Sequence, residues 1–107
     1  MATVFKVLGQ VIPAATTLTT LYTAAAPAVV STIVVCNQAT TTATYRISVR
    51  VAAAADTTKQ YIAYDVSVAG NDSTALTLGI TMASTDVISV YSSTATTSFT
   101  AFGSEIS

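Results

Sequence analysis

Apolar and polar residues alternate along most of the chain with a period of two. This is the pattern of a β-strand that has one buried face and one face toward water. Tyr45, Ile47 and Val49 fall on one side of such a strand, with Arg46 on the other side, and residues 76–81 repeat the alternation. The pattern therefore predicts strands and gives no sign of an amphipathic helix.

Turn-prone residues divide the chain at short, regular intervals, as is typical of a sandwich or barrel. The pattern predicts about eight short strands, over residues 3–11, 17–23, 28–37, 43–51, 60–68, 73–80, 86–92 and 97–106. We expect an all-β fold in which residues 1–107 form a single antiparallel β-sandwich domain, jelly-roll or Ig-like. A chain of 107 residues is long enough to bury a core without disulfides or metals.

Residues that favour turns predict how some of the strands are connected. The sequence Gly70-Asn71-Asp72-Ser73 combines residues that tolerate positive φ or bond to their own backbone, so we expect it to close a hairpin. Pro13 and Pro27 lack a main-chain donor and are expected at strand starts or in connections. Residues 37–42 are predicted to form a small polar loop, and residues 52–55 a helical turn.

The predicted strand 28–37 is apolar on both of its faces. This favours a central strand, covered by the second sheet on one side and by another subunit on the other. Cys36 lies in this strand and is expected to be a core residue. As the sole cysteine, it cannot form a disulfide within the chain.

The composition argues against the usual catalytic sites. Charged residues make up 8 % of the chain, against about 25 % in an ordinary domain. Without histidine, the common Ser-His-Asp and Cys-His arrangements are excluded. We expect no enzyme activity, no catalytic residues, no cofactor and no metal site. The five acids are expected to be turn and surface carboxylates: Asp56, Asp65, Asp72, Asp86 and Glu105.

Membrane and nucleic-acid partners are not expected either. The longest apolar stretch, residues 24–36, is shorter than the roughly 20 residues that a spanning helix needs. The N-terminus lacks the pattern of a leader peptide, so we expect synthesis in the cytoplasm. A net charge of −1 offers no basic patch for nucleic acid. Asn71-Asp72-Ser73 matches the glycosylation pattern but is expected to be only a turn.

The tyrosines and arginines are candidates for contact surfaces. Core or interface packing is expected for the five tyrosines, which are Tyr22, Tyr45, Tyr61, Tyr64 and Tyr91. Their spacing places Tyr61 and Tyr64 on opposite faces of a strand, so that one of them is exposed at a contact surface. Arg46 and Arg50 share a face and could pair with acids of a neighbouring subunit.

The threonine-rich strands carry few of the lysines that normally protect sheet edges from pairing with another chain. We therefore expect a symmetric homo-oligomer, or a subunit of a larger shell, in which those edges are covered.

Several strand-like segments resemble small virion proteins of tailed bacteriophages, of the kind found in phages of cyanobacteria and marine bacteria. They are residues 7–11, 17–23, 31–37, 61–65, 71–73, 76–80 and 101–106, so the resemblance extends over nearly the whole length of the chain. Many such proteins have a Pro-Ala-Gly-like turn where this chain has Ala24-Ala25-Ala26-Pro27. The resemblance implies a structural role in the particle and no site residues.

The expected function is therefore that of a virion structural protein that binds other virion proteins. Two placements stay open. One is a tail, baseplate or fibre-associated module, and the other is a capsid decoration (cement) protein that stabilises the particle. The alternative function is a carbohydrate-binding module that recognises the host surface from the virion.

Overall fold

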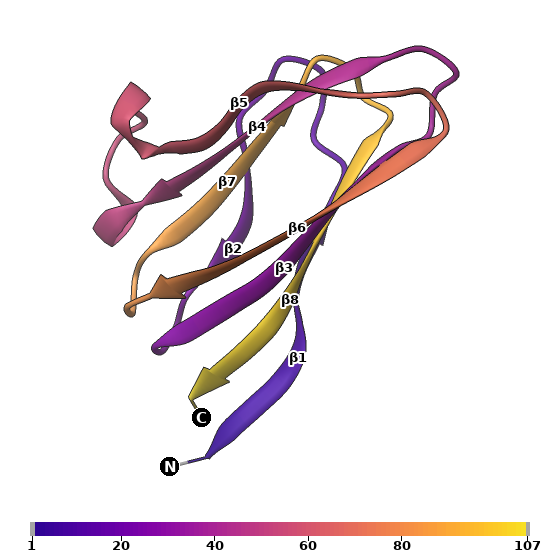
Figure 1. The fold of residues 1–107 in the computed structure, drawn as a ribbon. Coiled ribbons are helices and arrows are strands. Elements are labelled where there is room, and N and C mark those ends of the chain that lie inside the picture. The colour runs from indigo at the N-terminus through magenta and orange to yellow at the C-terminus, as the bar shows by residue number, and fades with distance from the viewer. Residues whose placement is uncertain (1, 107) are drawn as a thin grey trace.

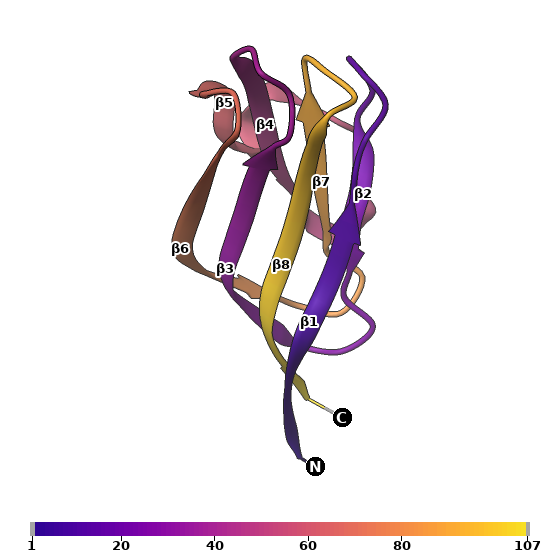
Figure 2. The same ribbon diagram turned by 90° about the vertical axis from the view of Figure 1, so that its right-hand side faces the viewer.

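The computed structural model describes residues 2–106 and consists of two four-stranded antiparallel sheets packed face to face (Figures 1 and 2). The molecule measures 45 × 27 × 19 Å and is elongated along its strands. The strands are β1 (Thr3–Val11), β2 (Thr19–Thr23), β3 (Ala28–Asn37), β4 (Ala43–Arg50), β5 (Tyr61–Val68), β6 (Asp72–Met82), β7 (Val87–Ser92) and β8 (Thr97–Ile106). The predicted all-β sandwich of eight strands is confirmed, and the predicted strand ends differ from these bounds by at most two residues.

The order of the strands identifies the sandwich as a jelly roll. One sheet has the order β1-β8-β3-β6 and the other β2-β7-β4-β5. All the connections between consecutive strands cross from one sheet to the other except the one from β4 to β5. This double Greek-key winding distinguishes the jelly roll from the Ig-like alternative.

The core lies between the sheets and is built from the inward-facing residues, which alternate along the strands with outward-facing ones. Val30, Ile33 and Val35 of β3 are completely buried. From the opposite sheet, Tyr45 of β4 meets Phe99 of β8 edge to face, with ring centroids 6.1 Å apart. This is a favourable geometry for an aromatic pair and fixes how the two sheets sit on each other.

Strand β3 is central in its sheet, with β8 and β6 on either side, as predicted. The prediction that Cys36 is a core residue is wrong. A bulge at Ser31 shifts the alternation, and the buried residues that follow are Ile33, Val35 and Asn37. Cys36 therefore lies on the outer face and is half-buried.

The predicted hairpin over residues 70–73 is also wrong, because this turn carries the chain from β5 in one sheet to β6 in the other. Asn71 does adopt positive φ (55°), and its N–H donates to the carbonyl of Ala39. Pro13 lies in the β1–β2 connection and Pro27 directly precedes β3, as expected. The helical turn predicted over residues 52–55 is not a regular one, because Val51–Ala53 form a single tight turn in which Ala52 and Ala53 have positive φ (53° and 56°). A short 3₁₀ turn spans Thr58–Gln60.

Asn37 forms hydrogen bonds to three connections that meet at one end of the sandwich. It is 1 % exposed, and its Nδ2 lies 2.8 Å from the carbonyl oxygen of Thr41 and 3.3 Å from those of Val68 and Ala69. Its Oδ1 accepts from the N–H of Ala39 and the hydroxyl of Thr96. Asn37 is thus a buried structural residue, although the sequence placed it at the start of a polar loop.

Asp86 holds the opposite end in a similar way. Its carboxylate accepts main-chain bonds from Ala52 at 2.8 Å and Ala83 at 2.9 Å, which keep the pKa of Asp86 below its ordinary value. The two bonds join the tight turn after β4 to the connection between β6 and β7.

We predict that Asn37→Ala lowers the free energy of unfolding by about 3 kcal/mol, because it leaves several buried polar groups without a partner. Urea denaturation of the two proteins measures this difference. Gln38→Ala is the matched control, since Gln38 is exposed and adjacent, and it should change stability by no more than about 0.5 kcal/mol. Equal effects of the two substitutions would contradict the role of Asn37.

We predict that the stabilisation from Asp86 disappears in acid. Because the pKa of Asp86 is lowered by folding, the stabilisation is present above the unfolded-state pKa of about 3.9 and is lost as the pH falls through the folded-state pKa. Urea unfolding across pH should show the wild type more stable than Asp86→Asn at neutral pH. The difference should shrink from about pH 5 downward. A difference that stays constant with pH would show that the carboxylate charge is not involved.

Candidate interaction surfaces

The two outer faces of the sandwich differ sharply in charge. On the β1-β8-β3-β6 sheet, the residues that alternate with the buried ones include no Lys, Arg, Asp or Glu. We call this surface the uncharged face and define it by Phe5, Val7, Val29, Ser31, Thr32, Val34, Ala75, Thr77, Thr100, Phe102 and Ser104. The arginines of the strands lie on the other sheet, at Arg46 and Arg50 of β4.

Apolar side chains are concentrated at one corner of the uncharged face. Phe5 is 82 % exposed, and Val7, Val29 and Phe102 are each about two-fifths to one-half exposed. Together with Lys6, Ser31, Gly103 and Ser104 they line a shallow groove across β1, β8 and β3. Folding leaves these apolar groups in water, which is the usual sign of a surface that another molecule covers.

The corner extends past the opposite sheet, as Figures 1 and 2 show for the ends of β1 and β8. All five residues of Thr3–Val7 are exposed. On the inward side, Lys6 lies 2.5 Å from Glu105, whose other oxygen accepts a 2.6 Å bond from the hydroxyl of Tyr22. The Lys6 and Tyr22 bonds hold the pKa of Glu105 below its ordinary value.

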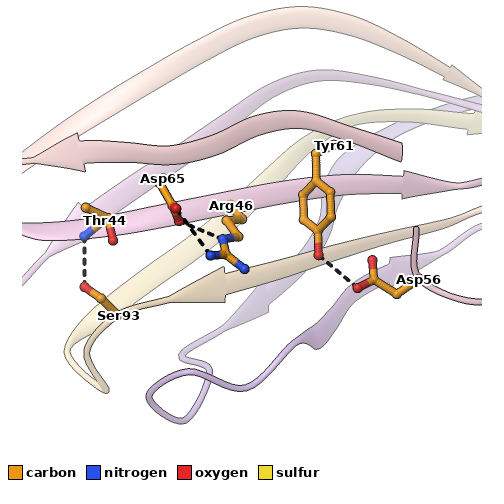
Figure 3. Close-up of polar contacts among 6 residues, drawn as sticks. All are labelled: Thr44, Arg46, Asp56, Tyr61, Asp65 and Ser93. Carbon is orange, nitrogen blue, oxygen red and sulfur yellow. Dashed lines mark hydrogen bonds and ion pairs between the residues drawn. The ribbon is translucent and has the colours of Figure 1, made fainter. Parts of the chain in front are cut away.

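The outer face of the other sheet carries a tyrosine–arginine cluster, formed by Arg46, Tyr61, Tyr64, Asp65 and Tyr91. The guanidinium carbon of Arg46 lies 4.2 Å from the ring centre of Tyr64 and 4.4 Å from that of Tyr91. Asp65, on the neighbouring strand, accepts from Nε of Arg46 at 2.7 Å and from Nη2 at 3.3 Å (Figure 3). This pairing raises the pKa of Arg46.

The prediction that Tyr61 and Tyr64 lie on opposite faces is wrong. The pairing of β4 with β5 shifts register twice, so β5 contains bulges that change which way its side chains point. The two rings meet edge to face, with centroids 5.1 Å apart. The hydroxyl of Tyr61 donates to Asp56 at 3.0 Å (Figure 3), and burial, followed by this bond, raises the pKa of Tyr61.

The same bulges make Asp65 the partner of Arg46, a pairing that a regular alternation of residues does not predict. Asp65 has a positive φ of 53°, which a regular strand would not allow, and this directs its carboxylate toward β4. Arg50 instead donates to the carbonyls of Ala54 and Ala53 and to Ser89. The pairing of these arginines with acids of a neighbouring subunit stays a prediction.

The acidic side chains do not form a cluster. Each of the five carboxylates has its own partners, and the bonds described give no two of them a partner in common. Within residues 2–106, no group of three or more His, Cys, Asp or Glu side chains could hold a metal ion. Over the same residues, no helix has the length and apolar character needed to cross a membrane. The expectation that the chain is not an enzyme stays a prediction.

Comparisons of the chain with protein-family models, with curated proteins and with solved structures found no match. The two surfaces described above are therefore the features that bear on its function.

Proposed function

We propose that the chain is a structural subunit of a bacteriophage particle, where it binds other virion proteins in the tail or baseplate or as a decoration protein on the capsid. The observation that carries this proposal is the uncharged face, together with its exposed corner of Phe5, Val7, Val29 and Phe102.

The energetics of the uncharged face favour contact with protein. Burying a charged side chain costs free energy unless it is paired, whereas apolar groups gain about 25 cal/mol for each Å² removed from water. The threonine and serine hydroxyls on this face can exchange water for hydrogen bonds to a partner. A whole sheet face can thus be covered without any charge having to find a counterpart.

The topology gives weaker support. Jelly rolls recur in viral capsid proteins and also in lectins. This is an analogy at the level of the fold, and one fold can carry many functions. It agrees with the likeness of the strand segments to small virion proteins.

We predict that Val29→Lys removes the protein from the particle, because it places a charge within the apolar corner of the proposed contact. Phage lacking the native gene would be grown with each variant supplied, and the protein bound to purified particles would be quantified. We expect at least about a tenfold loss, equivalent to about 1.4 kcal/mol of binding. The matched control is Ile62→Lys on β5, whose side chain is similarly exposed at 48 % against 40 % for Val29.

Retention of the Val29→Lys variant at the control level would overturn the proposed contact face. Absence of the native protein from purified particles would overturn the virion role. The copy number of the native protein per particle separates the placements, since hundreds of copies favour the capsid and a few tens or fewer favour the tail.

A second candidate function is recognition of a host-surface carbohydrate by the tyrosine–arginine cluster. The observation that favours it is Tyr64, which is 53 % exposed beside Arg46 and Asp65. Sugars commonly pack on aromatic rings while nearby charged groups bond to their hydroxyls.

For this candidate we predict that Tyr64→Ala weakens adsorption of the phage to its host by roughly tenfold, with particle composition unchanged. Val66→Ala, a change at 40 % exposure on the same strand, is the control and should adsorb normally. Normal adsorption by the Tyr64→Ala phage would remove the carbohydrate-binding candidate.

A further inference from the structure

The four edge strands of the sandwich are not equally protected against pairing with another chain. Strand β2 has only five residues and a register shift at Leu21. Strand β5 is interrupted by two bulges. Strand β6 is bent at Gly79, which has a φ of +63°, and begins with Asp72. Shortness, bulges and charges are the usual ways by which proteins make an edge unsuitable for pairing.

Over the segment Thr3–Val7, strand β1 is neither short nor bulged, so the charge of Lys6 is its only protection of this kind. This segment pairs with Phe102–Ile106 in unbroken register, and the shift in β1 comes only after Val7. It contains no proline, and its one charged residue, Lys6, is held by Glu105 on the inward side. The opposite side of β1 has no strand neighbour among residues 2–106, so a row of extended main-chain donors and acceptors faces outward.

We propose that Thr3–Val7 pairs with the same segment of a second copy of the chain, antiparallel and about a twofold axis at Phe5. In this register Phe5 lies opposite Phe5 of the other copy, Thr3 opposite Val7, and Val4 opposite Lys6. The two β1-β8-β3-β6 sheets join into one eight-stranded sheet, and the two uncharged faces become continuous.

Charge and symmetry favour a second copy as the occupant. An antiparallel pair of identical strands is self-complementary, which is what a twofold interface requires. The pairing puts no like charges directly opposite each other, because Lys6 faces Val4 and is neutralised by Glu105 of its own chain. The two phenylalanines, each 82 % exposed in the single chain, cover each other at the axis.

The size of the contact predicts a weak dimer. Five residues from each copy bury clearly less than the ~1,600 Å² of a standard stable interface. We therefore expect a dissociation constant on the order of 100 μM in solution. On a particle, where many copies are held close together, a contact of this strength would be largely occupied.

Sedimentation velocity of the full chain from about 10 μM to 1 mM tests the association, with a concentration-dependent dimer as the expected result. Phe5→Lys should remain monomeric over this range, because it places two positive charges at the axis. Val51→Lys is the matched control, since Val51 is a 66 % exposed apolar residue away from β1, and it should dimerise like the native chain. A native chain that stays monomeric at the highest concentration, or a Phe5→Lys chain that still dimerises, would overturn the proposal.

Disulfide trapping tests the register. Directly opposed strand residues have Cα atoms about 4.5–5.5 Å apart, within the range that a disulfide spans. In a Cys36→Ser background, Phe5→Cys should cross-link into a covalent dimer under mild oxidation. Thr3→Cys, on the same exposed segment, should not, because the two copies of residue 3 are about 13 Å apart along the strand. Equal cross-linking of both variants would contradict the twofold axis at Phe5.

The dimer extends the proposed assembly role, because it makes a second copy of the chain one of the partners. The dimer and the virion role can be disproved independently, because dimerisation is measured in solution with the isolated chain and the virion role is measured on particles.

Discussion

The fold depends on holding in place the connections that cross from one sheet to the other. At one end of the sandwich, hydrogen bonds of the Asn37 side chain do this. In a jelly roll, such crossings leave main-chain carbonyls at the end of the sandwich, where no strand can pair with them. The amide of Asn37, at the end of the central strand β3, lies within bonding distance of carbonyls from two connections and accepts the hydroxyl of Thr96 from a third. Because it is completely buried, these bonds compete little with water.

The same topology also places most of the charged residues away from the uncharged face. Strands β4 and β5, the consecutive pair that stays in one sheet, carry Arg46, Arg50 and Asp65. The segment between them adds Asp56 and Lys59. The four strands of the opposite sheet carry Lys6 and Glu105, which pair with each other on the inward side, and Asp72, which is the first residue of β6. The chain's few charges are therefore concentrated away from the face that we propose for assembly.

The two surfaces also differ in how many of their side chains find interaction partners within one chain. In the tyrosine–arginine cluster, Arg46 is stacked on two rings and bonded to Asp65, so its main interactions are made inside the molecule. On the uncharged face, Phe5 and its neighbours have no such partners on their exposed sides. A surface whose side chains are already paired with each other stabilises the single chain. An exposed apolar surface contributes favourable free energy mainly when another molecule covers it.

The alternation of apolar and polar residues by itself determined the eight strands and the all-β class, because strand periodicity is a local property of the chain. The apolar residues on both faces of the strand over residues 28–37 indicated its central position. The tertiary structure alone decided which strands pair, and with that it overturned the hairpin expected at residues 70–73. It also decided which way Cys36, Tyr64 and Asp65 point. Each lies beyond or at a bulge, and a single extra residue reverses the face of every side chain that follows it. Bulges form through pairing with a neighbouring strand, so strand periodicity alone does not reveal them.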